Sequence, residues 1–224
     1  MSIDADTSLT RIEATYNRIR QDIIDGELAP GERLGVDRLR ERYGVGASPI
    51  REALSLLSAE ALVTAVGQRG FAVAPISIDD LRDLGEARKL IEAQAVRESV
   101  RNGDDDWEGD LVAAFHRLTR AQERLAAGSI ESIPEWELRN REFHDALVSR
   151  CESKWLHFLL DTLMHHTERY RRASLTSGTV KRDVHGEHAA LMDAALARDP
   201  DRAAELIVEH IDQTVRVLEA QHAA

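Results

Sequence analysis

Residues 45–57 constrain the fold most, because they predict one short amphipathic helix with well-marked ends. Ser48 is the expected N-cap, and Pro49 the expected first helical residue, where its missing N–H costs nothing. Apolar residues recur at spacings of three and four, so one side of the helix is expected to face a core: Ile50, Ala53, Leu54 and Leu57. Arg51 lies off this side, near the end from which a recognition helix reaches DNA.

The preceding residues complete a predicted helix-turn-helix. Residues 34–43 form a second short amphipathic helix pattern, and residues 9–25 form a longer one. The inward residues of the short pattern are Val36, Leu39 and Tyr43. Gly44 follows directly and can adopt the left-handed conformation that ends a helix. Three helices with a tight turn between the second and third are therefore expected here.

A small β wing is predicted after the third helix. Residues 62–65 and 71–73 read as two strands around a glycine-containing turn at 66–70. Arg69 lies at the tip of this turn, where it could touch a groove or a phosphate of DNA. Residues 9–74 are thus expected to form a winged helix-turn-helix domain.

Only helical periodicity follows the linker at residues 75–77. Six helices are predicted, at 78–102, 107–127, 133–150, 153–173, 179–197 and 200–221. Their lengths suit one buried core, so residues 78–222 are expected to form an all-α antiparallel six-helix bundle. The predicted fold class is therefore mainly α, with the winged helix-turn-helix first and the bundle second.

Charge and cysteine content indicate how the protein could bind DNA and in which compartment it is expected. The net charge is −11, and residues 1–75 hold nine arginines against eleven acidic residues. DNA binding would therefore depend on a local basic cluster, made by Arg38, Arg40, Arg42, Arg51 and Arg69. The single cysteine, Cys151, excludes an internal disulfide, and no leader or membrane-spanning run is evident. A cytoplasmic protein with no membrane partner is expected.

Four polar residues interrupt the apolar faces of the predicted bundle helices. Asn140 and His144 are four residues apart and project from one helix face, while His188 and His210 lie on apolar stripes of two other helices. Bundle cores are places where facing helices build metal sites. Each histidine taken alone is more often a hydrogen-bonded core residue, so the convergence of all four carries the metal hypothesis.

The two halves together resemble a GntR-family transcriptional regulator of the FadR-type branch, whose C-terminal ligand-binding domain is called FCD. The resemblance covers about residues 10–220 and rests on residues 24–34, Tyr43-Gly44-Val45, residues 49–54, Leu57 and Arg69-Gly70-Phe71. It implies a homodimer that binds a pseudo-palindromic operator in double-stranded DNA.

The resemblance also implies which residues touch DNA: Ser48, Pro49, Arg51, Arg69 and Gly70. Arg38 and Arg40 are further candidates for phosphate contacts, although a solvated helix face explains them equally well. The chain has Gly46-Ala47 where the family usually has Ser or Thr followed by Arg, and Asp37 where it often has Arg. We therefore expect an operator that differs from the common family sequence.

In the FCD half, the family pattern falls on Asn140, His144, His188 and His210 and implies that they ligate a divalent metal, zinc first, with nickel or manganese as alternatives. Asn140 stands where the family usually has Asp, so the site loses its only fixed negative charge. The family implies a small carboxylate effector that completes the coordination. Arg88 is a candidate second anchor for that carboxylate, the alternative being an exposed arginine paired with Glu92.

The resulting hypothesis is a DNA-binding regulator, in the first instance a repressor, whose operator binding is controlled by an organic acid at a metal site. The alternatives are a regulator that responds to metal alone and a metalloenzyme. The absence of a well-placed general base and the attached DNA-binding head argue against an enzyme.

Overall fold

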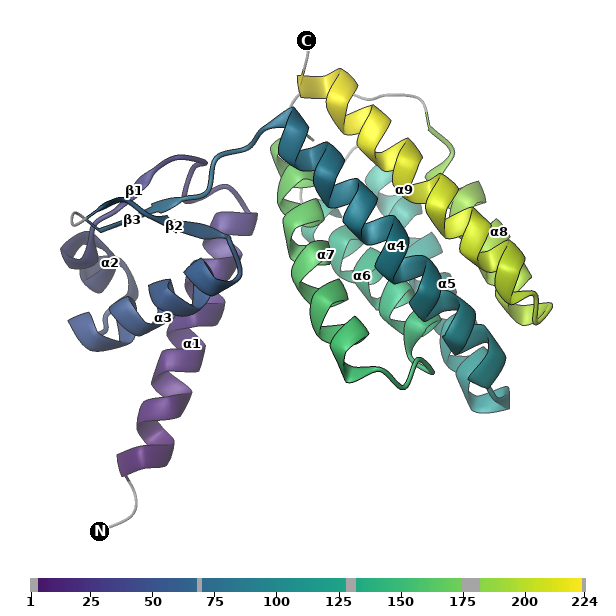
Figure 1. Ribbon diagram of the computed structural model, residues 1–224, viewed down its shortest axis with the longest axis horizontal. Coiled ribbons are helices and arrows are strands. Elements are labelled where there is room, and N and C mark those ends of the chain that lie inside the picture. The colour runs from purple at the N-terminus through teal and green to yellow at the C-terminus, as the bar shows by residue number, and fades with distance from the viewer. Residues whose placement is uncertain (1–3, 68–69, 128–131, 175–181, 223–224) are drawn as a thin grey trace. The chain divides into compact units, whose positions relative to one another are not determined.

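The computed structural model describes residues 4–67, 70–127, 132–174 and 182–222 (Figure 1). The chain divides into two compact units. Unit 1 consists of Met1–Asp80 with His165–Thr176, and unit 2 consists of Leu81–Met164 with Ser177–Ala224. The domain bounds expected from the sequence, 9–74 and 78–222, stay predictions.

The described residues before the linker in unit 1 form three helices and a small sheet. The helices are α1 (Asp4–Ile24), α2 (Val36–Tyr43) and α3 (Ala47–Ala59). The strands are β1 (Arg33–Leu34), β2 (Val63–Ala65) and β3 (Phe71–Val73), all antiparallel in the order β1-β3-β2. The winged helix-turn-helix is confirmed, but α2 begins two residues later than predicted because Arg33–Leu34 pairs with β3. Two residues are too few to show strand alternation in a sequence.

The start of α3 also differs from the prediction. Gly46 occupies the N-cap position, and no side chain caps the helix. Ser48 is therefore not the N-cap; its hydroxyl donates instead to Glu52 Oε1 at 2.6 Å. Pro49 is the third helical residue rather than the first, which is tolerated because the first four amides of a helix have no intrahelical acceptor.

The inward face of α3 forms the centre of the core of unit 1. Its four predicted core residues are fully buried: Ile50, Ala53, Leu54 and Leu57. They pack with residues of α1 and α2, among them Ile19, Ile23 and Leu39. Gly44 has φ 68° and ψ 33°, the left-handed conformation predicted for the turn between α2 and α3.

Unit 1 also includes the C-terminal part of α7 (Lys154–Ser174). Arg169 is buried there, and its Nη2 donates to the carbonyls of Ala74 and Pro75 at 2.6 and 2.7 Å. The Tyr170 hydroxyl donates to Asp80 Oδ2 at 2.6 Å. The linker residues thus have their carbonyl groups satisfied by side chains rather than by a strand or helix.

The remaining helices form the predicted bundle (Figure 1). Their bounds are α4 (Ile78–Asn102), α5 (Asp105–Ala126), α6 (Ile133–Val148), α7, α8 (Val184–Leu196) and α9 (Pro200–His222). The predicted start of α8 at residue 179 lies outside the described residues, as does all of 175–181. None of the described helices is long and apolar enough to cross a lipid bilayer.

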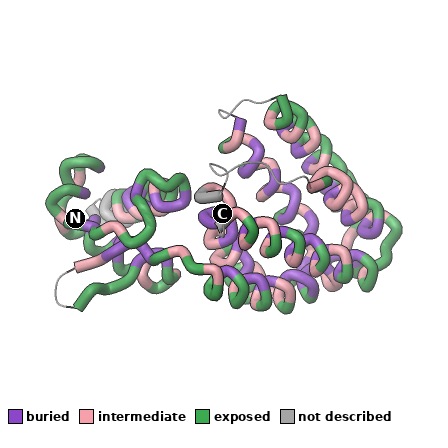
Figure 2. The backbone as a smooth tube through the Cα atoms, turned by 90° about the horizontal axis from the view of Figure 1, so that it is seen from above, coloured by how far each residue is buried: buried purple, intermediate pink, exposed green. Residues whose placement is uncertain are grey.

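Large apolar side chains fill the interior of unit 2. They include Trp107, Leu111, Phe143, Leu147, Leu191 and Ile207. Figure 2 shows buried positions recurring along each of these helices, as the sequence periodicity predicts. The polar residues that share these inward faces are consequently held inside the bundle.

We predict that Leu57→Ala lowers the free energy of unfolding of unit 1 by about 2–5 kcal/mol, because it opens a cavity at a fully buried position. Urea unfolding followed by tyrosine absorbance measures this, since Tyr16, Tyr43 and Tyr170 all belong to unit 1. The neighbouring Leu56, 49% exposed, is the matched control: Leu56→Ala should cost about 0.5 kcal/mol or less. Equal losses in the two variants would contradict the described orientation of α3.

Candidate metal centre and nucleic-acid interface

Three histidines from three helices meet inside unit 2. His144 lies on α6, His188 on α8 and His210 on α9, and one ring nitrogen from each lies within 4.8 Å of the others. Ring centroids are 5.4 Å apart for His144–His188, 5.3 Å for His144–His210 and 4.8 Å for His188–His210. Asn140, one turn before His144 on α6, is buried as well. The structure thus brings together the histidines that the sequence places on three separate apolar stripes.

Burial keeps the imidazoles of His188 and His210 neutral. His188 is 1% exposed and His210 7% exposed. Burial, and then the neighbouring histidines, lower the pKa of both residues well below the ordinary value. A metal ligand must be the deprotonated imidazole, so these two histidines are already in the form that binds a cation.

His188 has an unsatisfied buried nitrogen. Its Nε2 has no hydrogen-bond partner among the described residues, although the atom is inaccessible to solvent. An unpaired buried polar atom destabilises the fold by about 1–3 kcal/mol. A cation bound by Nε2 would satisfy it, and neutral imidazoles suit zinc, nickel and copper. The residues present therefore fit a divalent transition metal.

Two carboxylates orient two of the three imidazoles. Glu92 Oε1 lies 3.0 Å from His144 Nδ1, and Glu187 Oε2 lies 2.7 Å from His210 Nδ1. Burial alone would raise the pKa of Glu92, but the Arg88 charge and the His144 hydrogen bond lower it to about 2. An ionised carboxylate only accepts hydrogen bonds, so His144 Nδ1–H is the donor. With the hydrogen on Nδ1, Nε2 is the nitrogen that His144 would offer to a metal.

Arg88 is buried rather than exposed. Its side chain is 3% exposed, and its Nε and Nη2 donate to Glu92 Oε2 at 3.1 and 2.5 Å. The alternative weighed from the sequence, an exposed arginine paired with Glu92, is right about the pairing and wrong about the exposure, because this face of α4 points into the bundle. A role of Arg88 toward an effector stays a prediction.

The structure adds two residues to the site, Arg182 and Glu187, whose part in it was not predicted from the sequence. Arg182 precedes α8 in a polar stretch, and its Nε and Nη2 donate to the two carboxylate oxygens of Glu187 at 2.8 and 2.5 Å. With Glu92 and Glu187 present, Asn140 does not leave the site without carboxylates. Each of these two carboxylates is balanced by one arginine, however, so the two pairs add no net charge beside a bound cation. The adjacency of Glu187 and His188 was the available sequence clue.

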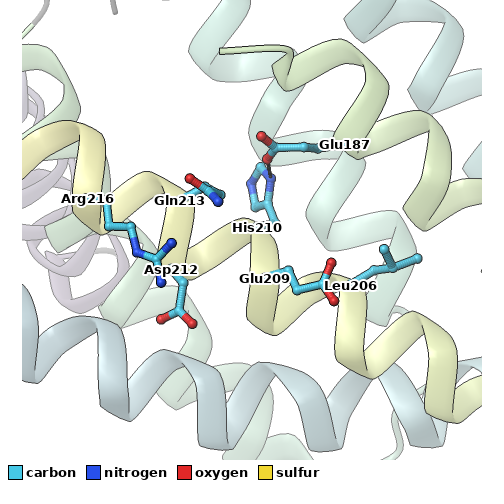
Figure 3. A pocket seen from close by; sticks show the side chains of 7 residues that line it. All are labelled: Glu187, Leu206, Glu209, His210, Asp212, Gln213 and Arg216. Carbon is cyan, nitrogen blue, oxygen red and sulfur yellow. Dashed lines mark hydrogen bonds and ion pairs between the residues drawn. The ribbon is translucent and has the colours of Figure 1, made fainter. Parts of the chain in front are cut away.

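A pocket opens beside His210 (Figure 3). Its volume is about 360 Å³, within the range that accepts a small organic ligand. It is lined by Glu187, Leu206, Glu209, His210, Asp212, Gln213 and Arg216. Figure 3 shows the Glu187 carboxylate pointing toward the His210 ring. The pocket therefore touches the histidine cluster at one edge, through His210.

The candidate DNA-contacting residues lie on the outer faces of α2 and α3. Arg51 is exposed on α3, next to Pro49 and Ser48. The exposed arginines of α2 form ion pairs: Arg38 with Glu32, Arg40 with Asp37, and Arg42 with Asp22. Arg69 lies outside the described residues, and Gly70 follows with φ 114°, a conformation that favours glycine. The expected basic cluster is thus partly neutralised in the free protein.

Comparison with known families agrees with this two-part organisation. Residues 11–73 match the family described as bacterial regulatory proteins, gntR family. Residues 83–213 match the FCD domain.

Similar proteins span almost the whole chain. The HTH-type transcriptional regulator BphR of Paraburkholderia xenovorans (strain LB400) is 46% identical over 207 residues, covering 92% of this chain and 84% of the relative. The HTH-type transcriptional repressor GlaR of Escherichia coli (strain K12) is 37% identical over 208 residues, covering 91% and 94%.

The solved structure of Escherichia coli McbR/YncC superposes with a TM-score of 0.80 at 23% identity, covering 95% of this chain and 98% of that one. A GntR regulator from Rhodococcus sp. RHA1 gives 0.75 at 21% identity, covering 94% and 98%. At such identities the likeness supports the fold alone.

We predict that Glu92→Gln lowers the free energy of unfolding of unit 2 by about 3–5 kcal/mol, because it leaves the buried Arg88 charge uncompensated. Tryptophan fluorescence during urea unfolding reports it, since Trp107, Trp136 and Trp155 all belong to unit 2. Glu86→Gln is the control, because Glu86 is 71% exposed and pairs with Lys89 one turn away on the same helix. Its loss should be about 1 kcal/mol or less.

Proposed function

This chain belongs to the GntR family of bacterial transcriptional regulators and carries an FCD domain, and we propose that a small organic acid bound at a metal in the histidine cluster controls its binding to DNA. That it is a DNA-binding transcriptional regulator follows from the family. The relatives and the fold are those of regulators, so the protein is not an enzyme. The metal, the effector and repression are the proposed parts.

The proposed DNA-reading element is α3 in the major groove. Arg51 would contact bases or phosphates from the first turns of α3, with Ser48 and the half-buried Pro49 beside it, because Arg51 and Ser48 are exposed while the opposite face is held in the core. Arg69 and Gly70 of the wing would add a second contact, and Arg38 and Arg40 would bind phosphates after exchanging their acidic partners. Two copies of the chain would read the two halves of a pseudo-palindromic operator.

The proposed metal ligands are Asn140, His144, His188 and His210. The observation that carries the proposal is the convergence of three buried histidines with an unpaired His188 Nε2. A divalent ion there, zinc first and nickel or manganese as alternatives, would supply a positive centre for a carboxylate. Neutral ligands and arginine-balanced carboxylates leave that charge undiminished, which favours an anionic effector.

The proposed effector is a small carboxylate, for which the pocket at His210 offers about 360 Å³. Arg88 would be its second anchor if the acid draws the guanidinium from Glu92. Arg88 and Glu92 lie on α4, which begins directly after the linker. An acid that changes their pairing could therefore alter the helix leading to the DNA-binding head, provided it binds one arrangement more tightly than the other. Repression is proposed because the relative GlaR is named a repressor.

Regulation by metal alone is the second candidate. A cation bound at the unpaired His188 Nε2 would satisfy this nitrogen whether or not an organic acid also binds. The two candidates differ in what releases DNA: metal alone in one, acid together with metal in the other.

We expect the affinity for the operator to fall when a small carboxylic acid that binds the His210 pocket is added to zinc-loaded protein. Fluorescence anisotropy on DNA from the protein's own promoter measures this affinity. The acid should have no effect after chelation or in His188→Gln. His116→Gln is the control, because His116 is exposed on α5 away from the cluster. An acid response that survives chelation would refute the metal-centred effector site, and a response to zinc alone would favour the second candidate.

Arg51→Ala is expected to weaken operator binding by about 1–3 kcal/mol, because Arg51 is the one basic residue of α3 and its side chain is exposed. The salt dependence of affinity separates a phosphate contact, whose loss reduces the slope by about 1, from a base contact. Arg101→Ala changes the net charge equally but lies on α4 in unit 2, so its affinity should match that of the wild type. Equal losses in both variants would reduce the effect to net charge.

A further inference from the structure

Two histidines of the cluster are each in contact with a carboxylate that is itself paired with an arginine. In each case, the arginine donates to the carboxylate, and the carboxylate faces Nδ1 of the imidazole. One set consists of Arg88, Glu92 and His144, and the other of Arg182, Glu187 and His210. We call each set a relay. The relay that begins at Arg182 lies at the pocket edge of the cluster, because Glu187 and His210 line the pocket.

Arg182 is committed to neighbours on α8 and α9. Besides Glu187, its Nη1 donates to Thr214 Oγ1 at 2.9 Å, and its Nη2 donates to the backbone carbonyl of His210 at 2.9 Å. Four of the five N–H bonds of a guanidinium are thereby used. Such a group has little capacity left for a ligand, so its role lies in holding Glu187 against α9.

The distance between Glu187 and His210 determines the tautomer of the imidazole. Oε2 and Nδ1 are 2.7 Å apart, which is favourable only with a hydrogen between them. Since Glu187 receives two donors from Arg182 and acts as a carboxylate, the hydrogen belongs to Nδ1 of His210. Arg182 Nη2 is also 3.2 Å from Nδ1, but this contact cannot be a hydrogen bond in the same tautomer. A neutral imidazole with Nδ1–H has its lone pair on Nε2.

We propose that Arg182 is a positioning residue of the metal centre. It holds Glu187 so that His210 keeps Nδ1–H and presents Nε2 to the cation. The proposal rests on the metal site of the proposed function. Without Arg182, Glu187 is free to turn toward solvent, because its side chain is already 24% exposed. His210 would then populate both tautomers, and only one of them offers Nε2.

The Arg182 relay is the better one to test. Arg88 and Glu92 are 3% and 2% exposed, so removing either threatens the folding of unit 2. Arg182 and Glu187 are 13% and 24% exposed, which allows water to replace a lost partner. An arginine–glutamate pair that touches no histidine supplies the control: Arg202 and Glu205 pair at 3.0 Å on the exposed side of α9.

The first measurement uses full-length, metal-free protein labelled with 15N in its histidines. Long-range proton–nitrogen correlation spectra identify which ring nitrogen carries the hydrogen, with the His210 signals assigned by their loss in His210→Gln. We expect His210 in the wild type and in Arg202→Met to show Nδ1–H. In Arg182→Met, signals of the Nε2–H tautomer should appear. Retention of a pure Nδ1–H tautomer in Arg182→Met would overturn the proposal.

The second measurement is zinc affinity, by competition with a chromophoric chelator. Loss of a group that orients a metal-binding histidine weakens binding by about 10–100-fold, which is the loss we expect for Arg182→Met. Arg182→Lys, which keeps the charge but loses the forked contact with Glu187, should lose less. Arg202→Met should stay within twofold of the wild type. An affinity for zinc in Arg182→Met within twofold of the wild type would overturn the proposal.

A second variant guards against misfolding. Glu187→Met keeps the length of the side chain but removes the acceptor, so it should reproduce both the tautomer change and the loss of zinc affinity; wild-type behaviour in both readouts would overturn the relay. If wild-type protein binds no zinc but Arg182→Met still shifts the tautomer, the metal part of the proposed function fails and the action of Arg182 on His210 stands. The two failures are therefore distinguishable.

Discussion

The burial of three imidazoles in one helical bundle is the constraint on which the rest of the C-terminal half depends. Taking polar rings out of water destabilises the fold unless each nitrogen finds a partner. Glu92 and Glu187 satisfy one nitrogen each on His144 and His210, whereas Nε2 of His188 stays unpaired among the described residues. One buried nitrogen of the cluster therefore lacks a hydrogen-bond partner among the described residues, and a bound cation would supply a partner for it.

The carboxylates that accept hydrogen bonds from the imidazoles are negatively charged groups held away from water, and two arginines compensate their charge. A buried ionised carboxylate is tolerated when an opposite charge and good hydrogen bonds accompany it. Arg88 and Arg182 do this for Glu92 and Glu187, so the groups behind the histidines are polar and firmly held but electrically balanced. Such surroundings orient metal ligands without cancelling the charge of a bound cation, a combination suited to attracting an anion.

The DNA-binding half uses a different balance between a rigid core and an open surface. Four apolar residues of α3 are fully buried, which fixes the helix and leaves Arg51 on its exposed side. The arginines of α2 pair with acidic residues of the same unit. The excess of acidic residues in the chain therefore also reduces the positive charge of the surface that is proposed to contact DNA. Exposed pairs of this kind are weak and can exchange for phosphates, which makes affinity for DNA sensitive to salt.

The sequence alone determined most of the elements, because helical and strand periodicity, the left-handed Gly44 and the apolar faces of α3 and of the bundle helices are local properties. The family followed from the resemblance carried by residues 24–34, 43–45, 49–54 and 69–71. The sequence also placed His144, His188 and His210 on inward faces. Local rules failed where a contact spans the chain, since β1 exists only through pairing with β3. They also misplaced the N-cap of α3, which is Gly46 rather than Ser48. Only the tertiary structure decided the relays, since Glu92 lies 52 residues from His144, and Arg182 28 from His210. No periodicity within one helix records which side chain of another helix will face it.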